Sequence, residues 1–132
     1  MVYLTLLHQS FKNIHMSIDL KEDSQVEIES NFSFNINYNE DNTSCIAELK
    51  QILTHKTDPQ QLNILVESKG QFACEGIVSD ETKKEAHVMA YTQLFPYVQN
   101  MIAQLTVNAG LPPLMIGISK MDPSDVKLVD NT

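Results

Sequence analysis

Hydrophobic and polar residues alternate most regularly between residues 32 and 38. In this segment Phe32, Phe34, Ile36 and Tyr38 are separated by single Ser or Asn residues. A period of two gives a strand one apolar and one polar face, as in an antiparallel sheet that is covered on one side only. Three further segments have the apolar content of strands: residues 2–20, 44–55 and 61–77.

The first of these strands is expected to be bent. Its apolar residues change phase between the early leucines and the later alternation that includes Phe11 and Ile14, which predicts a bulge within residues 8–13. Gly70 lies inside the last strand and predicts a second bulge or bend there. Because short polar turns join the strands, we expect an antiparallel meander of four strands.

A helical pattern follows the strands. Ser79 has the character of an N-cap, and from Ala86 to Leu105 the apolar residues are spaced by three and four. Pro96 lacks a backbone donor and disfavours helical geometry in the preceding residue. We therefore expect a short helical turn or loop up to about Tyr91 and a main helix that begins near Leu94, with the proline in its first turn.

The chain after the main helix is short. Ala109 and Gly110 are expected to end the helix, and residues 114–118 are apolar and extended. Asp122 followed by a proline predicts a last helix of about two turns. The expected fold is α+β, a single domain over residues 1–132 with four antiparallel strands, one main helix and a short C-terminal helix.

The main helix lies in the longest uncharged part of the chain, residues 86–119. Its apolar surface is wider than the stripe of slightly more than 100° that a helix needs to cover a sheet. One interpretation is a deeply buried core helix; the other, which we favour, is that one stripe packs on the sheet and the other on a second copy of the protein. The candidate oligomer-interface residues are Leu94, Phe95, Tyr97, Val98, Met101, Ile102 and Leu105.

The charge pattern limits the partners. The chain has 17 acidic and 9 basic residues, a formal net charge of −8, and no arginine. Nucleic acid is therefore an unfavourable partner, because no basic patch is present to neutralise phosphates. No apolar run reaches the length of a membrane span, and the first residues do not have the pattern of a signal peptide, so we expect no membrane insertion and a cytoplasmic location.

No set of residues suggests catalysis or metal binding. His8, His15, His55 and His87 lack metal-ligand spacing, and phosphate-binding glycine motifs are absent. We expect a protein that is not an enzyme and needs no cofactor. Cys45 and Cys74 lie on strands that can form a hairpin, where a disulfide is one option and two reduced, half-buried thiols are the other, which we favour.

Three motifs together resemble a known family. They are Leu-Phe-Pro-Tyr at residues 94–97, Gly-Leu-Pro-Pro-Leu at residues 110–114, and Gly-Gln-Phe-Ala-Cys-Glu-Gly at residues 70–76. This combination resembles the bacterial protein-export chaperone SecB. The resemblance implies an ATP-independent holdase that binds unfolded polypeptides and assembles as a dimer of dimers. Dimers pair through the first strand, and the main helices pack between dimers.

The resemblance also implies an apolar groove for clients. The groove would lie between the sheet, the connection after the first strand and the C-terminal segment. Its candidate residues here are Val26, Ile28, Phe32, Phe34, Leu114, Ile116, Met121 and Val126. Methionine suits such a site because its flexible side chain packs against many sequences. Plain core packing is the alternative, above all for Phe32, Phe34 and Ile116.

The sequence does not determine the identity of the client or whether a motor protein binds. In the family, acidic positions on the outer face of the sheet meet the motor protein SecA. The corresponding positions here are Asn13, Ser17 and Leu65, none of them acidic, so binding of SecA is doubtful. General export and a dedicated client, such as the antitoxin of a toxin–antitoxin pair, are both consistent with the sequence. From a different functional class, a carrier of small apolar ligands is the alternative.

Overall fold

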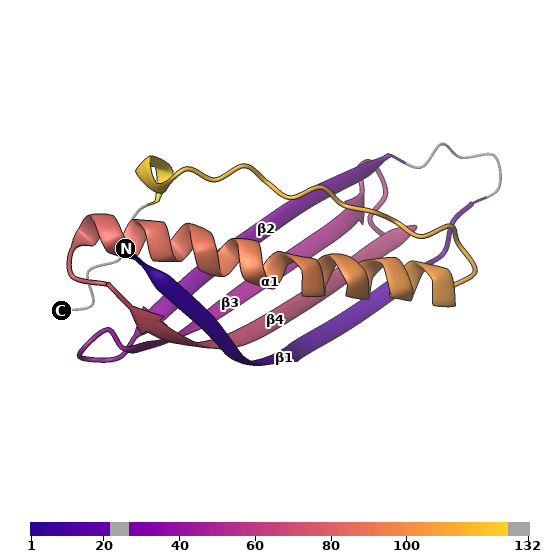
Figure 1. Cartoon of the computed structure of the whole chain (residues 1–132). Coiled ribbons are helices and arrows are strands. Elements are labelled where there is room, and N and C mark those ends of the chain that lie inside the picture. Colours follow the sequence, from indigo (N-terminus) through magenta and orange to yellow (C-terminus); the bar gives the residue numbers. More distant parts are fainter. Residues whose placement is uncertain (22–26, 127–132) are drawn as a thin grey trace.

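Four antiparallel strands form one sheet, and a single long helix lies across one face of it (Figure 1). The computed structural model describes residues 1–21 and 27–126. Its elements are β1 (Tyr3–Ile18), β2 (Ile28–Tyr38), β3 (Ser44–His55), β4 (Leu62–Glu75), α1 (Asp80–Asn108) and the short 3₁₀ helix η1 (Pro123–Asp125). This confirms the predicted α+β fold with four antiparallel strands and one main helix.

The strand order is β1-β4-β3-β2. The predicted meander holds for β2, β3 and β4, but β1 pairs with β4 and not with β2. The chain therefore passes from one edge of the sheet to the other between β1 and β2. Alternation along a strand indicates which face is apolar but not which edge the strand joins, so the sequence pattern could not identify this crossover.

The irregularity predicted in β1 is confirmed. Its register against β4 shifts between Leu6 and His8 and again between Phe11 and Asn13. Of the bulge or bend predicted at Gly70, the bulge is absent, because Gly70 pairs regularly with Gln9 on one side and with β3 on the other. A Cβ atom on Gly70 would lie 2.7 Å from Cδ2 of Leu94. A side chain at this position would have to displace Leu94, so glycine lets α1 pack close to the strand.

Helix α1 runs without interruption from Asp80 to Asn108, so the predicted break before Pro96 is wrong. Ser79 caps it as expected, in a reciprocal capping box with Thr82. Pro96 is on the exposed side of the helix, as is Thr92, whose carbonyl would otherwise accept a hydrogen bond from residue 96. Water can solvate that carbonyl, so the helix tolerates the proline in its interior.

The hydrophobic core lies between α1 and the middle of the sheet. Alternate residues of β3 and β4 face the helix, and many of them are fully buried. The fully buried residues from both layers include Ala47, Leu49, Leu53, Ile64, Val66, Phe72, Leu94, Val98 and Ile102. We call the helix-covered side of the sheet the inner face and the other side the outer face.

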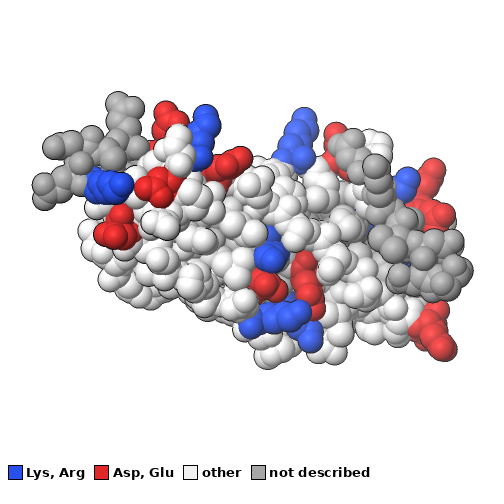
Figure 2. Space-filling model, turned by 180° about the vertical axis from the view of Figure 1, so that it is seen from behind, with Lys and Arg blue, Asp and Glu red and all other residues white. Residues whose placement is uncertain are grey.

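The outer face carries opposite charges in pairs. Lys50 lies directly opposite Glu67, and Glu48 lies opposite Lys69 and forms an ion pair of 3.3 Å with Lys12. Figure 2, which views the molecule from behind, shows basic and acidic side chains gathered together in the middle of this face. Cross-strand pairs of opposite charge favour the observed register and leave the middle of the face without a patch of one sign.

The close approach at Gly70 generates a stability prediction. Gly70→Val places a branched side chain against Leu94 and Phe72, so we expect the free energy of unfolding to fall by about 1–3 kcal/mol through overpacking. Gly117→Val is the matched control, because a Cβ atom there meets nothing within 4 Å. Urea unfolding followed by circular dichroism measures both variants. Equal stability of the two variants would contradict this packing role.

Candidate functional site

Helix α1 covers the inner face of the sheet unevenly. The inner-face residues of β3 and β4 are largely buried, whereas those of β2 are only half-buried. The half-buried set is Ile28, Phe32, Phe34, Ile36 and Tyr38. The β2 side of the sheet therefore retains accessible apolar surface, which a soluble domain ordinarily hides unless the surface is used for binding.

Two predicted groove residues pack against the first half of the helix. The ring centroids of Phe32 and Tyr91 lie 5.2 Å apart in a stacked arrangement, and those of Phe34 and His87 lie 4.8 Å apart, edge to face. Burial lowers the pKa of His87, which favours its neutral ring in this apolar setting. Phe32 and Phe34 thus combine packing with partial exposure.

The chain after α1 turns back and runs along the helix (Figure 1). Gly110 ends the helix with a positive φ of 85°, as expected from the sequence. Three side chains of α1 hold the returning segment by hydrogen bonds to its backbone. Thr106 Oγ1 accepts from the Leu114 N–H (2.9 Å), Gln99 Nε2 donates to the Ile116 carbonyl (2.8 Å), and Tyr91 Oη accepts from the Ser119 N–H (3.2 Å).

Side chains of this segment alternate between inside and outside. Ile116 is buried and Leu114 is half-buried, whereas Met115 between them is 61% exposed. Of the other predicted groove residues, Met121 is half-buried and Val126 is buried. Val26 lies outside the described residues. Only three residues of the predicted final helix, Pro123–Asp125, form a helical turn, and residues 127–132 are outside the described part.

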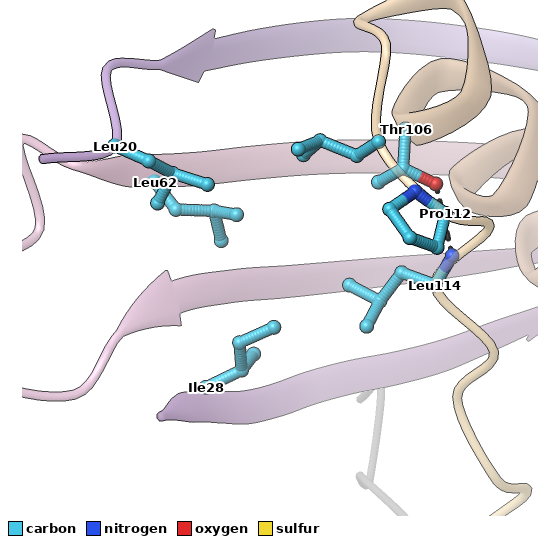
Figure 3. Close-up of a pocket in the computed structure, with 7 residues that line it drawn as sticks. Leu20, Ile28, Leu62, Thr106, Pro112 and Leu114 are labelled. Atoms are coloured by element: carbon cyan, nitrogen blue, oxygen red, sulfur yellow. Dashed lines mark hydrogen bonds between the residues drawn. The ribbon is translucent and has the colours of Figure 1, made fainter. Parts of the chain in front are cut away.

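An apolar pocket of about 260 Å³ opens beside the end of α1. Figure 3 shows Leu20, Ile28 and Leu62 projecting from the sheet side, and Thr106, Pro112 and Leu114 facing them from the helix end and the segment after it. The seven residues that line the pocket are Leu20, Ile28, Leu62, Thr106, Leu111, Pro112 and Leu114. The pocket therefore continues the accessible side of β2 at its N-terminal end.

Sequence reasoning found two of the pocket residues, Ile28 and Leu114, and missed the other five. Leu20 and Leu62 resemble ordinary strand-end residues, and Thr106 resembles an ordinary polar position on a helix. Pro112 and Leu111 lie in the Gly-Leu-Pro-Pro-Leu motif, which indicates a family but not a pocket. These residues are far apart in the chain, so only the folded arrangement brings them together.

The predicted oligomer-interface residues fall into two groups. Four of them are buried in the chain's own core: Leu94, Phe95, Val98 and Ile102. Tyr97 is 41% exposed, and Met101 and Leu105 are half-buried. Only the second group has side-chain surface left for a partner.

The two cysteines lie side by side on the inner face at the other end of the sheet. Cys45 and Cys74 are free and buried, with their sulfur atoms 3.3 Å apart. Burial raises the pKa of both thiols, which disfavours the reactive thiolate. Within residues 1–21 and 27–126, no cluster of three or more metal-binding side chains is found.

None of the described helices is long and apolar enough to cross a membrane.

Comparison with known proteins assigns this arrangement to a family. The family model for SecB, preprotein translocase subunit SecB, matches residues 3–122. The protein-export protein SecB of Anaplasma marginale, in strains Florida and St. Maries, is 39% identical over 71 residues, covering 44% of this chain and 41% of the relative. The match thus spans less than half the length of these curated relatives.

Two solved structures share the fold. The Mycobacterium tuberculosis SecB-like chaperone Rv1957, in complex with a ChAD peptide from the HigA1 antitoxin Rv1956, superposes with a TM-score of 0.70 at 12% identity, covering 90% of this chain and 92% of that one. A protein of unknown function from Streptococcus agalactiae gives a TM-score of 0.60 at 11% identity, covering 89% and 99%. With the family match over residues 3–122, the sheet, its crossover and its single long helix place this chain in the SecB family.

Proposed function

We propose that this protein is an ATP-independent holdase that binds unfolded or partly folded polypeptides. The observation that carries the proposal is the uneven cover of the inner face, which leaves β2 half-exposed and opens a pocket at its end. An unfolded chain supplies apolar side chains that suit such a surface. The SecB-like chaperone of similar fold was solved with a peptide from an antitoxin, which supports a polypeptide as the occupant.

The pocket is small for a carrier of apolar ligands. Its volume of about 260 Å³ is below the range of about 300–1,000 Å³ that is usual for small-molecule sites. It is also open, with half-buried residues around it. Both features favour single side chains of a longer polypeptide over an enclosed small molecule.

A dedicated client is favoured over general export by the outer face. Asn13 and Ser17 are exposed there and Leu65 is half-buried, so the positions that meet SecA in the family offer no acidic group. The nearby charges lie in pairs of opposite sign, such as Lys50 and Glu67. A motor protein that docks on acidic positions has little to bind here.

We also propose that the chain forms oligomers, with a dimer of dimers as the expected form. Strand β1 is at an edge of the sheet and exposes Tyr3, Leu7 and Ile14. A long edge strand is a template for pairing with another chain. On α1, Tyr97 and Met101 present apolar surface to a second contact.

The two free thiols are consistent with a reducing compartment such as the cytoplasm.

Client binding is tested with Leu114→Gln. The change removes apolar surface from the pocket wall at similar side-chain size, so we expect affinity for an unfolded polypeptide to fall by about 1 kcal/mol, or fivefold. Met115→Gln is the control, because this neighbour points to solvent. Fluorescence anisotropy with labelled, reduced and carboxamidomethylated α-lactalbumin measures the dissociation constant. Wild-type protein that binds no unfolded chain and does not delay client aggregation would refute the proposed function.

Oligomer formation is tested with Met101→Lys. A charge at Met101, whose half-buried side chain lies at the flank of α1, is expected to reduce the mass measured by light scattering while the circular dichroism spectrum stays unchanged. Thr92→Lys is the charge-matched control, since Thr92 is exposed nine residues away on the opposite side of the helix. Ile102 is fully buried in the chain's own core, so a lysine there would test folding instead. An unchanged mass for Met101→Lys would exclude this side of α1 as an interface.

A further inference from the structure

One small polar residue interrupts the apolar inner row of β2. Ser30 pairs with Leu53, which is fully buried on the inner face, and residues paired across strands share a face of the sheet. Ser30 therefore belongs to the same row as Ile28 and Phe32, which lie two residues away on either side. Those two side chains are half-buried, whereas Ser30 is exposed. Its hydroxyl thus lies on the part of the inner face that the helix leaves uncovered.

This position lies between two apolar features of the candidate site. Ile28 lines the pocket, as Figure 3 shows, and Phe32 stacks on Tyr91 of the helix. Side chains two residues apart on a strand are separated by about 7 Å. An extended polypeptide that places one apolar side chain in the pocket and another against Phe32 therefore passes over Ser30. Because Ser30 is exposed, such a polypeptide reaches its hydroxyl directly.

A buried amide determines the direction of the Ser30 hydroxyl. Gln51 is only 4% exposed, and its Nε2 donates to Ser30 Oγ at 2.7 Å and to the Asn31 carbonyl at 3.3 Å. A carbonyl can only accept, so the amide nitrogen of Gln51, and not its oxygen, faces β2. The Ser30 oxygen is therefore an acceptor towards Gln51, and the hydroxyl proton points away from the amide.

The hydroxyl proton of Ser30 has no acceptor within residues 1–21 and 27–126. It is a donor in a row whose other members are apolar or aromatic: Ile28, Phe32, Phe34, Ile36 and Tyr38. A hydrocarbon ligand that displaces water from this row would leave the donor unpaired, at a cost in free energy. A polypeptide avoids that cost, because it carries a carbonyl at every residue.

We infer that the Ser30 hydroxyl donates a hydrogen bond to a backbone carbonyl of the polypeptide bound along β2. The inference rests on the proposed function and adds a specific polar contact to it. The neighbouring apolar residues accept the side chains of the client, and Ser30 accepts only a client that also presents a hydrogen-bond acceptor between them. The contact thereby favours peptide backbone over a purely apolar ligand.

Two substitutions of nearly equal shape test the hydroxyl. Ser30→Thr retains a hydroxyl on a branched side chain, and Ser30→Val has a methyl group in its place. We expect Ser30→Thr to bind labelled, reduced and carboxamidomethylated α-lactalbumin like the wild type, and Ser30→Val to bind it about three- to tenfold more weakly. If this position contributed apolar surface alone, Ser30→Val would bind more tightly than Ser30→Thr. Fluorescence anisotropy measures the dissociation constants.

Ser33→Val is the matched control. Ser33 is an exposed serine of the same strand, but it lies on the outer face, opposite Lys50. This variant should bind the probe like the wild type. Circular dichroism melting curves identify a temperature at which every variant is folded, and binding is compared there. Should Ser30→Val fail to fold, Ser30→Ala, which only removes the oxygen atom, replaces it with the same expected loss.

The outcomes distinguish this inference from the proposed function. If the wild type binds the probe and removal of the Ser30 hydroxyl leaves the affinity unchanged or higher, the inference is wrong and the holdase proposal stands. An equal loss in Ser30→Thr and Ser30→Val would assign the effect to side-chain size, and an equal loss in Ser33→Val would assign it to the strand as a whole. Either result overturns the inference. A wild type that binds no probe overturns both proposals.

Discussion

The structure depends on one helix packing across a sheet that is wider than the helix can cover. Helix α1 buries the inner faces of β3 and β4, and at Gly70 a Cβ atom would lie only 2.7 Å from Cδ2 of Leu94 on the helix. The inner face of β2 lies beyond this contact and stays half-buried. Burial of apolar surface drives folding, so the residual exposure on β2 marks the surface that is left for another polypeptide.

The segment after α1 limits this exposure without closing it. Side chains of Thr106, Gln99 and Tyr91 hold its backbone beside the helix, so it contributes Leu114 and Ile116 to the inner side and leaves Met115 in solvent. These separate side-chain hydrogen bonds hold the extended segment less cooperatively than the regular backbone hydrogen bonds between strands of a sheet would. The pocket lies at the beginning of this segment. Its walls on the sheet side come from the strand ends, and its other wall comes from a segment whose backbone is held at single positions only.

Local patterns predicted local features well. The alternation from Phe32 to Tyr38 identified β2, the phase change in the first strand indicated that it is irregular, and Ser79 marked the helix cap. Features that depend on distant partners were not predictable. Pro96 is tolerated because its side of the helix faces water. The alternation along β1 does not indicate which free edge it joins, that of β4 or that of β2. Likewise, the pocket arises only where Leu20, Leu62 and the end of the helix meet.

Amide hydrogen exchange in the presence of a saturating unfolded polypeptide tests the central claim most directly. If the uncovered side of β2 and the returning segment hold the client, exchange should slow in residues 27–34 and 111–119, where many backbone N–H groups lack a partner in the sheet or helix. Core amides of β3 and β4 should keep their rates. Unchanged exchange in both segments at saturation would show that the client binds elsewhere and would contradict the account.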